Sequence, residues 1–280
     1  MSTVILGSRG QLGSELAQLL PEANALSRLE LDITSPEMIS AVLNPLKPTC
    51  VINCTAYNQV DLAEKEPEAA WQSNALGPRN LAQYCANHKS RLIHISTDFV
   101  YGIKRKPARP LTEQDLPDPR SVYGVSKLAG EYFVQTECSQ SLIIRTCGLY
   151  GRGGNGNFVK TMLRLAREGK PLRVVDDQFC APTSVKDLAS AVLKLQTIHA
   201  TGLFHFVNRG QVSWYEFTKM IFALTELDVE ITPISSAEYG AIAKRPQYSV
   251  LDCSKYCEET NSRIRTIKDA LKEYLRSEMV

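Results

Sequence analysis

The feature that most constrains the fold is a regular alternation of short β-rich runs with longer amphipathic blocks through the first half of the chain. The β-rich runs are Thr3–Leu6, Asn24–Leu26, Cys50–Asn53, Leu92–Ser96 and Leu142–Thr146. The helical blocks are Gln11–Leu20, Pro36–Leu43, Pro67–His88 and Tyr123–Cys138. Units of this kind join parallel strands through right-handed crossovers. The alternation therefore predicts an α/β fold with a Rossmann-like, doubly wound parallel sheet and helices on both faces.

After Thr146 the alternation of strands and helices becomes less regular, which predicts a second structural unit. Helix-like runs occur at Phe158–Arg167, Val185–Leu195, Ser213–Leu224 and Ile264–Leu275. Short strand candidates are Leu172–Val175, Gly202–Phe206 and Ser249–Leu251. We expect a Rossmann domain over residues 1–150 and a smaller, discontinuous α/β C-terminal lobe over 151–280, with strands near 172–208 returning to the first sheet. The irregular segment Lys104–Pro119 is long enough to be expected to cover a functional site.

Composition argues against several classes of protein. The chain has 44% hydrophobic and 22% charged residues, which are ordinary globular values. A net charge of +2 gives no broad attraction for nucleic acid or an anionic membrane. No apolar run approaches the roughly 18 residues of a membrane span. With no export signal and no Cys-x-x-Cys pair, we expect a cytoplasmic protein with reduced thiols and no metal site.

A glycine-rich turn follows the first predicted strand. Gly7 suits a tight turn, Gly10 lets the backbone approach a pyrophosphate, and Gly13 allows close packing of helix on strand. Free N–H groups at the start of the next helix can then bind the phosphate. The sequence therefore predicts a dinucleotide site in this turn. The structural alternative is a glycine turn that holds no ligand.

The end of the second predicted strand bears on the choice of cofactor. NAD sites commonly carry an acid there, about 20 residues past the glycines. If the strand ends near Leu26, its tip carries Arg28, which suits the 2′-phosphate of NADP, with Arg9 in support. If the chain runs on to Glu30, NAD is favoured. We favour Arg28 because Pro21 leaves room for only a short strand; the alternative is that Arg28 is a solvated surface residue.

A Tyr-x-x-x-Lys pair, Tyr123 and Lys127, falls within a predicted helix, where residues four apart share a face. A nearby ammonium favours the phenolate and lowers the tyrosine pKa from about 10. Such a tyrosine can pass a proton to a carbonyl oxygen as hydride reaches the carbon. Thr97 follows a predicted strand and offers a hydroxyl that can orient the carbonyl. The segment 53–57 ends the preceding strand and would lie beside the cofactor.

Further motifs extend this pattern along the chain. The relevant stretches are GSRGQLG (7–13), LDIT (31–34), NCTAYNQVDLAEKEPEAA (53–70), STDFVYG (96–102), YGVSKLAGE (123–131), GNFVKTML (156–163), DQFCAPTS (177–184), SWYEF (213–217) and RPQYSVLD (245–252). The chain thereby resembles the extended short-chain dehydrogenase/reductases and, among them, the dTDP-4-dehydrorhamnose reductase family. The early motifs are shared by many extended reductases, whereas the late ones are particular to this family.

The resemblance implies reduction of a 4-keto-6-deoxysugar nucleotide by NADPH, with NADH as the alternative cofactor. Catalytic residues are then Thr97, Tyr123 and Lys127. The expected cofactor-binding residues are Gly7, Arg9, Gly10, Gln11, Leu12, Gly13, Arg28, Asp32, Ile33, Thr55, Ala56, Tyr57, Tyr123 and Lys127. The expected substrate-binding residues are Thr97, Asp98, Phe99, Asn157, Lys160 and Arg245. The expected partner is the small-molecule nucleotide sugar, without nucleic acid or membrane, and the resemblance allows a homodimer.

Several positions bear on the choice between this family and related ones. Dehydratases of the superfamily usually carry Glu directly after the Thr-Asp pair, where this chain has Phe99. A regulatory-subunit branch of the family also exists, and the intact catalytic positions argue against that role. Gly148 stands where the family often has an aromatic residue, so we expect a lost stacking surface near the sugar. Trp214 is expected to anchor the C-terminal lobe.

Overall fold

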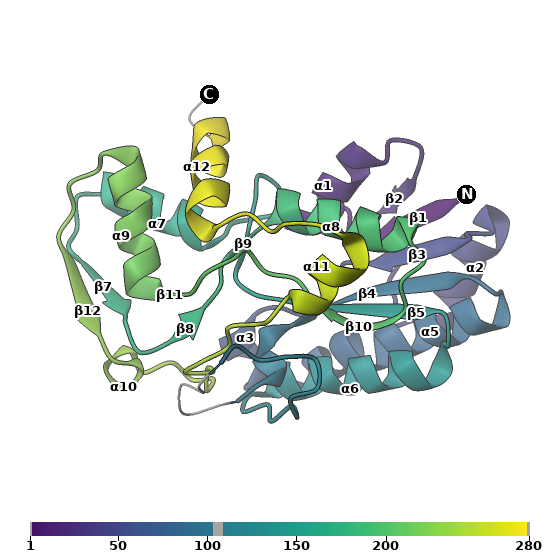
Figure 1. Ribbon diagram of the computed structural model, residues 1–280. Coiled ribbons are helices and arrows are strands. Elements are labelled where there is room, and N and C mark those ends of the chain that lie inside the picture. The colour runs from purple at the N-terminus through teal and green to yellow at the C-terminus, as the bar shows by residue number, and fades with distance from the viewer. Residues whose placement is uncertain (1, 103–108, 279–280) are drawn as a thin grey trace.

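Six parallel strands form the central sheet of the computed structural model, which describes residues 2–102 and 109–278 (Figure 1). The strands are β1 (Thr3–Leu6), β2 (Asn24–Leu26), β3 (Cys50–Asn53), β4 (Arg91–Thr97), β5 (Ser141–Thr146) and β10 (Gly202–His205). Their order is β10-β5-β4-β3-β1-β2. The predicted parallel sheet is confirmed. Because β2 and β3 lie on opposite sides of β1, the carboxyl ends of β1 and β3 form the switch point where such sheets bind ligands.

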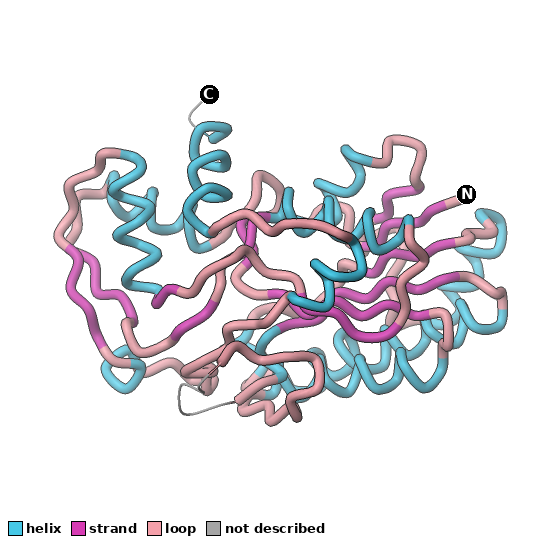
Figure 2. The backbone as a smooth tube through the Cα atoms, in the orientation of Figure 1, coloured by secondary structure: helices cyan, strands magenta, loops and turns pink. Residues whose placement is uncertain are grey.

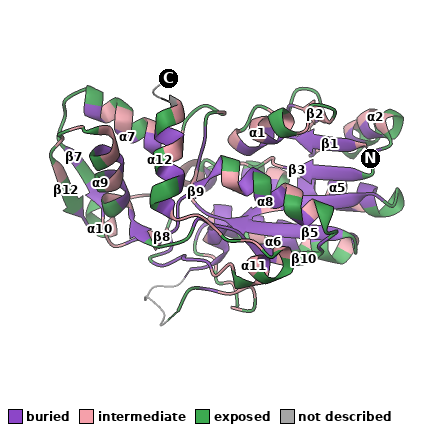
Figure 3. Ribbon diagram, turned by 45° about the horizontal axis from the view of Figure 1, so that its top comes forward, coloured by how far each residue is buried: buried purple, intermediate pink, exposed green. Residues whose placement is uncertain are grey.

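Helices cover both faces of this sheet (Figures 1 and 3). On one face lie α1 (Gln11–Leu19) and α8 (Val185–Thr197), with α11 (Ser254–Thr260) beside β10. On the other lie α2 (Pro36–Leu46), α5 (Gly77–Asn87) and α6 (Val122–Glu137). Ser35 and Ser121 cap α2 and α6 by accepting a hydrogen bond from a backbone N–H. Apolar side chains from each helix pack on the strands, so the sheet core is fully buried on both sides.

The long helix expected at Pro67–His88 is not uniform. It consists of α4 (Pro67–Trp71), a π-helical stretch η1 (Gln72–Leu76) and α5, and it is preceded by the short α3 (Val60–Ala63). Helix α6 approaches η1 closely: a Cβ atom on Gly130 would lie 2.1 Å from the Asn74 carbonyl oxygen. This contact therefore requires a glycine. Beyond β4, a short 3-10 turn, η2 (Asp98–Val100), completes the region around the site.

The C-terminal lobe lies beside the carboxyl ends of the sheet strands (Figure 2). Its helices are α7 (Phe158–Arg167), α9 (Trp214–Thr225), α10 (Ser236–Tyr239) and α12 (Ile267–Glu278). Its strands form the pairs β7 (Leu172–Val175) with β12 (Ile231–Ile234), β8 (Phe179–Cys180) with β11 (Val212–Ser213), and β6 (Leu149–Tyr150) with β9 (Thr183–Ser184). The helices α7, α9 and α12 share one apolar core with these strands.

Two expectations about later strands need correction. Of the strands near 172–208, Gly202–His205 joins the central sheet, whereas Leu172–Val175 pairs with β12 in the lobe. The strand expected at Ser249–Leu251 does not form, because Tyr248 and Leu251 make single bridges to different segments, Phe179 and Leu111. Residues 104–108 of the predicted covering segment lie outside the described residues. No helix in the described ranges is long and apolar enough to cross a membrane.

Candidate active site

The glycine turn has the geometry of a phosphate cradle. Gly7 adopts φ +83°, and its N–H donates to the Leu26 carbonyl at 2.9 Å. A Cβ atom on Gly13 would lie 2.2 Å from the Gly7 carbonyl oxygen, so the helix can pack here only with glycine. Gly10 is the N-cap of α1, and no described side chain caps this end. The amide groups that begin α1 at Gln11 and Leu12 therefore suit the pyrophosphate of a dinucleotide.

The tip of β2 distinguishes the two readings of cofactor choice. The strand ends at Leu26, and Arg28 lies exposed in the following turn, where its Nε is 3.1 Å from Asp32 Oδ2. The Glu30 carboxylate folds back and accepts hydrogen bonds from Ser27 N at 2.8 Å and Ser27 Oγ at 2.7 Å. These bonds lower the pKa of Glu30, and Arg9 is near enough to add to the effect. Two cations, Arg9 and Arg28, thus stand at the strand tip.

Two further segments adjoin the predicted cofactor site. Asp32 accepts from the Thr34 N–H at 2.9 Å, and Ile33 is buried against the position of Gly77. After β3, Thr55 donates to Asn53 Oδ1 through its N–H at 3.0 Å and its hydroxyl at 2.7 Å. The carbonyl carbon of Cys54 would lie 3.1 Å from a Cβ atom on Gly7, so this loop packs on the glycine turn.

Past Thr55, the loop continues through the exposed Ala56 to Tyr57, whose N–H donates to Asn74 Oδ1 at 2.8 Å. Asn74 in turn donates to Ser126 on α6 at 3.1 Å. The loop after β3 is therefore tied to the helix that carries Tyr123 and Lys127.

The three predicted catalytic side chains are buried at the carboxyl end of β4. Thr97 ends the strand, where its hydroxyl accepts from Phe99 N and donates to Asp98 Oδ1, both at 3.2 Å. The Tyr123 ring packs edge-on against Phe99 with centroids 5.4 Å apart. Lys127 Nζ donates to the Ile95 carbonyl at 2.6 Å. Strand β4 and helix α6 thus bring a hydroxyl, a phenol and an amine to one place.

The electrostatics of these groups follow from burial. Burial raises the pKa of Tyr123 to about 12, and a hydrogen bond with Thr97 acts in the opposite direction. Burial lowers the pKa of Lys127 to about 8, while Glu131 and Cys54 act to raise it. Burial also raises the pKa of Asp98. The net shift of the Tyr123 pKa is upward, so the lowering of the tyrosine pKa by Lys127 stays a prediction.

A buried ion pair lies one turn beyond Lys127. The Glu131 carboxylate accepts from Arg145 Nη2 at 2.6 Å and also from the Ser96 hydroxyl. The two charged side chains are 1% and 4% exposed. Arg145 also donates to the Tyr101 hydroxyl at 2.6 Å. This network fixes α6 against β4 and β5 directly behind the catalytic residues.

Next to Thr97, a cavity of about 380 Å³ opens between the sheet and the C-terminal lobe. Its size suits a small organic ligand. Its wall combines residues after β4 and β5 with residues of the lobe, among them Asp98, Phe99, Cys147, Gly148, Phe158, Gln178, Trp214 and Arg245. The catalytic strand and the lobe thus face the same space, as a substrate site requires.

Trp214 lies in this wall. Gly148 adopts φ +52°, and a Cβ atom there would lie 3.1 Å from Trp214 Cη2 and 3.3 Å from Pro182 Cα. The Trp214 ring packs on Phe158 with centroids 4.6 Å apart. The aromatic surface expected to be lost at Gly148 is therefore present beside it, supplied by α9. Trp214 packs within the lobe as expected, but it also lines the cavity, which the sequence did not indicate.

Of the six predicted substrate residues, Thr97 precedes the cavity wall in the chain without being part of it, and the other five fall into two groups. Asp98, Phe99 and Arg245 line the cavity, and Arg245 pairs with Asp61 at 2.7 Å. Asn157 and Lys160 are not among the described residues that line it. Asn157 caps α7 and donates to Gln11 Oε1 at 3.1 Å, and Lys160 Nζ donates to the Arg152 carbonyl at 2.6 Å. Substrate contact by these two residues stays a prediction.

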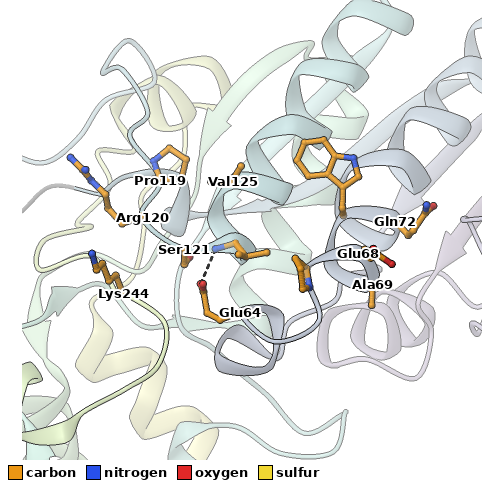
Figure 4. Close-up of a pocket in the computed structure, with 12 residues that line it drawn as sticks. Glu64, Glu68, Ala69, Gln72, Pro119, Arg120, Ser121, Val125 and Lys244 are labelled. Atoms are coloured by element: carbon orange, nitrogen blue, oxygen red, sulfur yellow. Dashed lines mark hydrogen bonds between the residues drawn. The ribbon is translucent and has the colours of Figure 1, made fainter.

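A wider surface hollow of about 1050 Å³ lies near the start of α6 (Figure 4). Its wall includes Glu64, whose carboxylate accepts from Val122 N at 2.8 Å, and Trp71. It contains none of the predicted site residues. In residues 2–102 and 109–278, no group of three or more His, Cys, Asp or Glu side chains is placed to hold a metal ion.

A family model described as the RmlD substrate binding domain matches residues 1–280. The chain belongs to the RmlD family. It is 40% identical over 271 residues to dTDP-4-dehydrorhamnose reductase of Aggregatibacter actinomycetemcomitans, a match that covers 90% of each chain. It is 39% identical to the spore coat polysaccharide biosynthesis protein SpsK of Bacillus subtilis, covering 98% of this chain and 96% of SpsK. The resemblance to the dTDP-4-dehydrorhamnose reductase family, inferred from the sequence motifs, is thereby confirmed.

Solved structures with the same fold include two reductases of similar sequence. A dTDP-4-dehydrorhamnose reductase of Clostridium acetobutylicum matches with a TM-score of 0.96 and 40% identity, covering 100% of both chains. A reductase of the same name from Bacillus anthracis, in complex with NADP, matches with a TM-score of 0.95 and 37% identity, covering 99% of this chain and 100% of that one. A UDP-glucose 4-epimerase of Thermotoga maritima shares the fold at 19% identity, with a TM-score of 0.84 and full coverage of both chains.

Proposed function

We propose that this chain is an NADPH-dependent reductase of the 4-keto group of a dTDP-4-dehydro-6-deoxysugar, with dTDP-4-dehydrorhamnose as substrate and dTDP-L-rhamnose as product. The observation that carries the proposal is the position of Thr97, Tyr123 and Lys127. Thr97 precedes Asp98 and Phe99 of the cavity wall, and Tyr123 packs on Phe99. Lys127 lies near Cys54, whose backbone packs on Gly7 of the glycine turn. The names of the relatives at about 40% identity support this substrate class.

When bound, NADPH supplies the hydride. The chain's own residues then have three tasks at the carbonyl. Thr97, whose hydroxyl accepts from the Phe99 N–H, turns its proton from Asp98 to the ketone oxygen and so orients the ketone at the tip of β4. Tyr123 donates its phenolic proton to that oxygen. Lys127 supports the phenolate that results and binds the nicotinamide ribose.

The cofactor preference rests on the tip of β2. Arg28 and Arg9 provide positive charge for a 2′-phosphate, whereas the Glu30 carboxylate is engaged by Ser27. The Bacillus anthracis reductase was solved in complex with NADP, which supports the same choice. Dehydration is disfavoured, because Phe99 stands where a dehydratase usually carries its acid and its ring packs on Tyr123.

The test is turnover by the purified full chain. We expect NADPH oxidation that depends on dTDP-4-dehydrorhamnose and yields dTDP-rhamnose. The control variant Tyr123→Phe should oxidise NADPH far more slowly under the same conditions. Equal rates with and without the sugar nucleotide, in a folded enzyme, would contradict the proposal.

A further inference from the structure

A line of three buried polar side chains leads from the sheet to the catalytic lysine. Asn53 ends β3, His94 lies in the middle of β4, and Lys127 lies on α6; each is at most 2% exposed. Asn53 Nδ2 is 3.1 Å from His94 Nδ1, and His94 Nε2 is 3.4 Å from Lys127 Nζ. Both ring nitrogens of His94 are thus engaged, one by an amide and one by the amine proposed to act in catalysis.

The orientation of the Asn53 amide is set by the chain itself. The backbone N–H of Thr55, which can only donate, lies 3.0 Å from Asn53 Oδ1, and the Thr55 hydroxyl adds a second bond at 2.7 Å. Turning the amide over would put its NH₂ group against that N–H, leaving two buried donors face to face. Asn53 therefore presents its NH₂ group, not its oxygen, to the histidine.

This orientation fixes the proton on His94. The imidazole is neutral, because burial and the neighbouring Lys127 hold the pKa of His94 well below its ordinary value. With Nδ1 accepting from Asn53, the single ring proton must be on Nε2. An N–H group therefore points at Lys127 Nζ. Such a donor suits a neutral amine, which offers a lone pair, and opposes an ammonium, which offers only further donors.

We infer that His94 is a positioning residue for Lys127: its Nε2–H group, held in that tautomer by Asn53, disfavours the ammonium and so sets the pH above which reduction slows. The inference rests on the proposed function, in which Lys127 must be charged to support the Tyr123 phenolate. The same N–H also directs the charged lysine toward the Ile95 carbonyl and away from the sheet.

The other titratable groups around Lys127 do not disfavour its ammonium form in the way that the His94 N–H group does. Glu131, one turn further along α6, raises the pKa of Lys127 but shares its carboxylate with Arg145 of β5. The Cys54 thiol, after β3, acts in the same direction, although burial raises its own pKa to about 12. Tyr123 lies one turn before Lys127 on α6. His94 contacts Lys127 from β4, and the position of its ring proton can favour or disfavour the charged form of Lys127.

The first test measures the tautomer directly, without turnover. In ¹⁵N-histidine-labelled full chain, the His94 signals are assigned by their loss in His94→Gln, and the ring shifts distinguish the two tautomers. We expect the Nε2–H form between pH 6 and 8. Asn53→Asp keeps an oxygen for Thr55 but offers a second one to Nδ1, so it should reverse the tautomer to Nδ1–H. An Nδ1–H or doubly protonated His94 in the wild-type protein would overturn the inference.

The second test measures kcat against pH for two matched variants. Phe at position 94 removes both the acceptor for Asn53 and the donor toward Lys127, whereas Gln can present its Oε1 to Asn53 and its NH₂ group to Lys127. For His94→Phe we expect the basic limb of the profile to move up by about one pH unit, the range of one hydrogen bond to a charged group. His94→Gln should keep the wild-type limb. If the basic limb of the pH profile falls at the same pH in both folded variants, the inference is wrong, whatever their kcat values.

The two tests also separate this inference from the proposed function. If the labelled protein shows the Nε2–H tautomer but the sugar nucleotide is not reduced, the proposed function is wrong, and so is the catalytic role of Lys127. If the enzyme reduces the sugar nucleotide and the wild-type tautomer is Nδ1–H, only the role of His94 fails.

Discussion

Trp214 lies against Gly148, with ring atom Cη2 3.1 Å from the position that a Cβ atom would take on that glycine. The two residues come from different parts of the fold, the first turn of α9 and the segment after β5. Both line the proposed substrate cavity. A side chain at position 148 would contact this ring, so the glycine leaves the space that the Trp214 ring occupies.

Trp214→Ala should weaken binding of the nucleotide sugar. An aromatic contact of this kind contributes about 0.5–1.5 kcal/mol, which corresponds to a rise in KM for the sugar nucleotide of roughly twofold to tenfold. The KM for NADPH should not change, since Trp214 faces the cavity and not the glycine turn. Trp214→Phe, which retains a ring, is the control. A KM for the sugar that is unaltered in Trp214→Ala would show that the ring serves packing alone.

Tyr123→Phe should lower kcat by about a hundredfold or more, the usual contribution of a positioned general acid. NADPH affinity, measured by fluorescence titration, should stay close to that of the wild type, because the ring and its packing on Phe99 are retained. Turnover at the wild-type rate would remove Tyr123 from the mechanism.

Arg28→Ala should weaken NADPH binding and leave NADH binding nearly unchanged, because only NADPH carries the 2′-phosphate. A hydrogen bond to a charged group contributes about 1.5–3 kcal/mol, and exposure of Arg28 places the effect at the low end, roughly tenfold in Kd. The double variant with Arg9→Ala should show a larger loss. Equal losses for both cofactors would indicate a general defect, and no loss for either would direct attention to Glu30.

Arg145→Met should destabilise the fold by about 3–5 kcal/mol, because it leaves the Glu131 carboxylate buried without its partner. Adding Glu131→Gln should recover much of that loss, as judged by denaturant midpoints of the single and double variants. If Arg145→Met were as stable as the wild type, the Glu131–Arg145 ion pair would not stabilise the packing of α6 on the sheet.

The central sheet and the cofactor turn could be predicted because their signals are local. Thr3–Leu6 is a run rich in β-branched residues that is followed at once by Gly7, and Pro21 follows the end of the first helix. Tyr123 and Lys127 are four residues apart, so they lie on the same face of α6. Each of these signals lies within a few residues along the chain.

The remaining features depend on contacts between distant segments. His94 sits in an apolar strand, where a histidine is expected to serve packing, and only the positions of Asn53 and Lys127 show otherwise. Strand β12 contains Pro233, which argues against a strand, but the proline is tolerated because β12 pairs with β7 alone. Trp214 reaches the cavity only because the first turn of α9 lies beside Gly148, which follows β5.

Isotope labelling can follow the hydride from NADPH to the sugar directly. The full chain is given dTDP-4-dehydrorhamnose and NADPH that carries deuterium at the transferred position of the nicotinamide, and the sugar product is examined by mass spectrometry and NMR. We expect one deuterium in each dTDP-rhamnose molecule, bonded to C4. Product without deuterium, or with deuterium at another carbon, would contradict the proposed reduction.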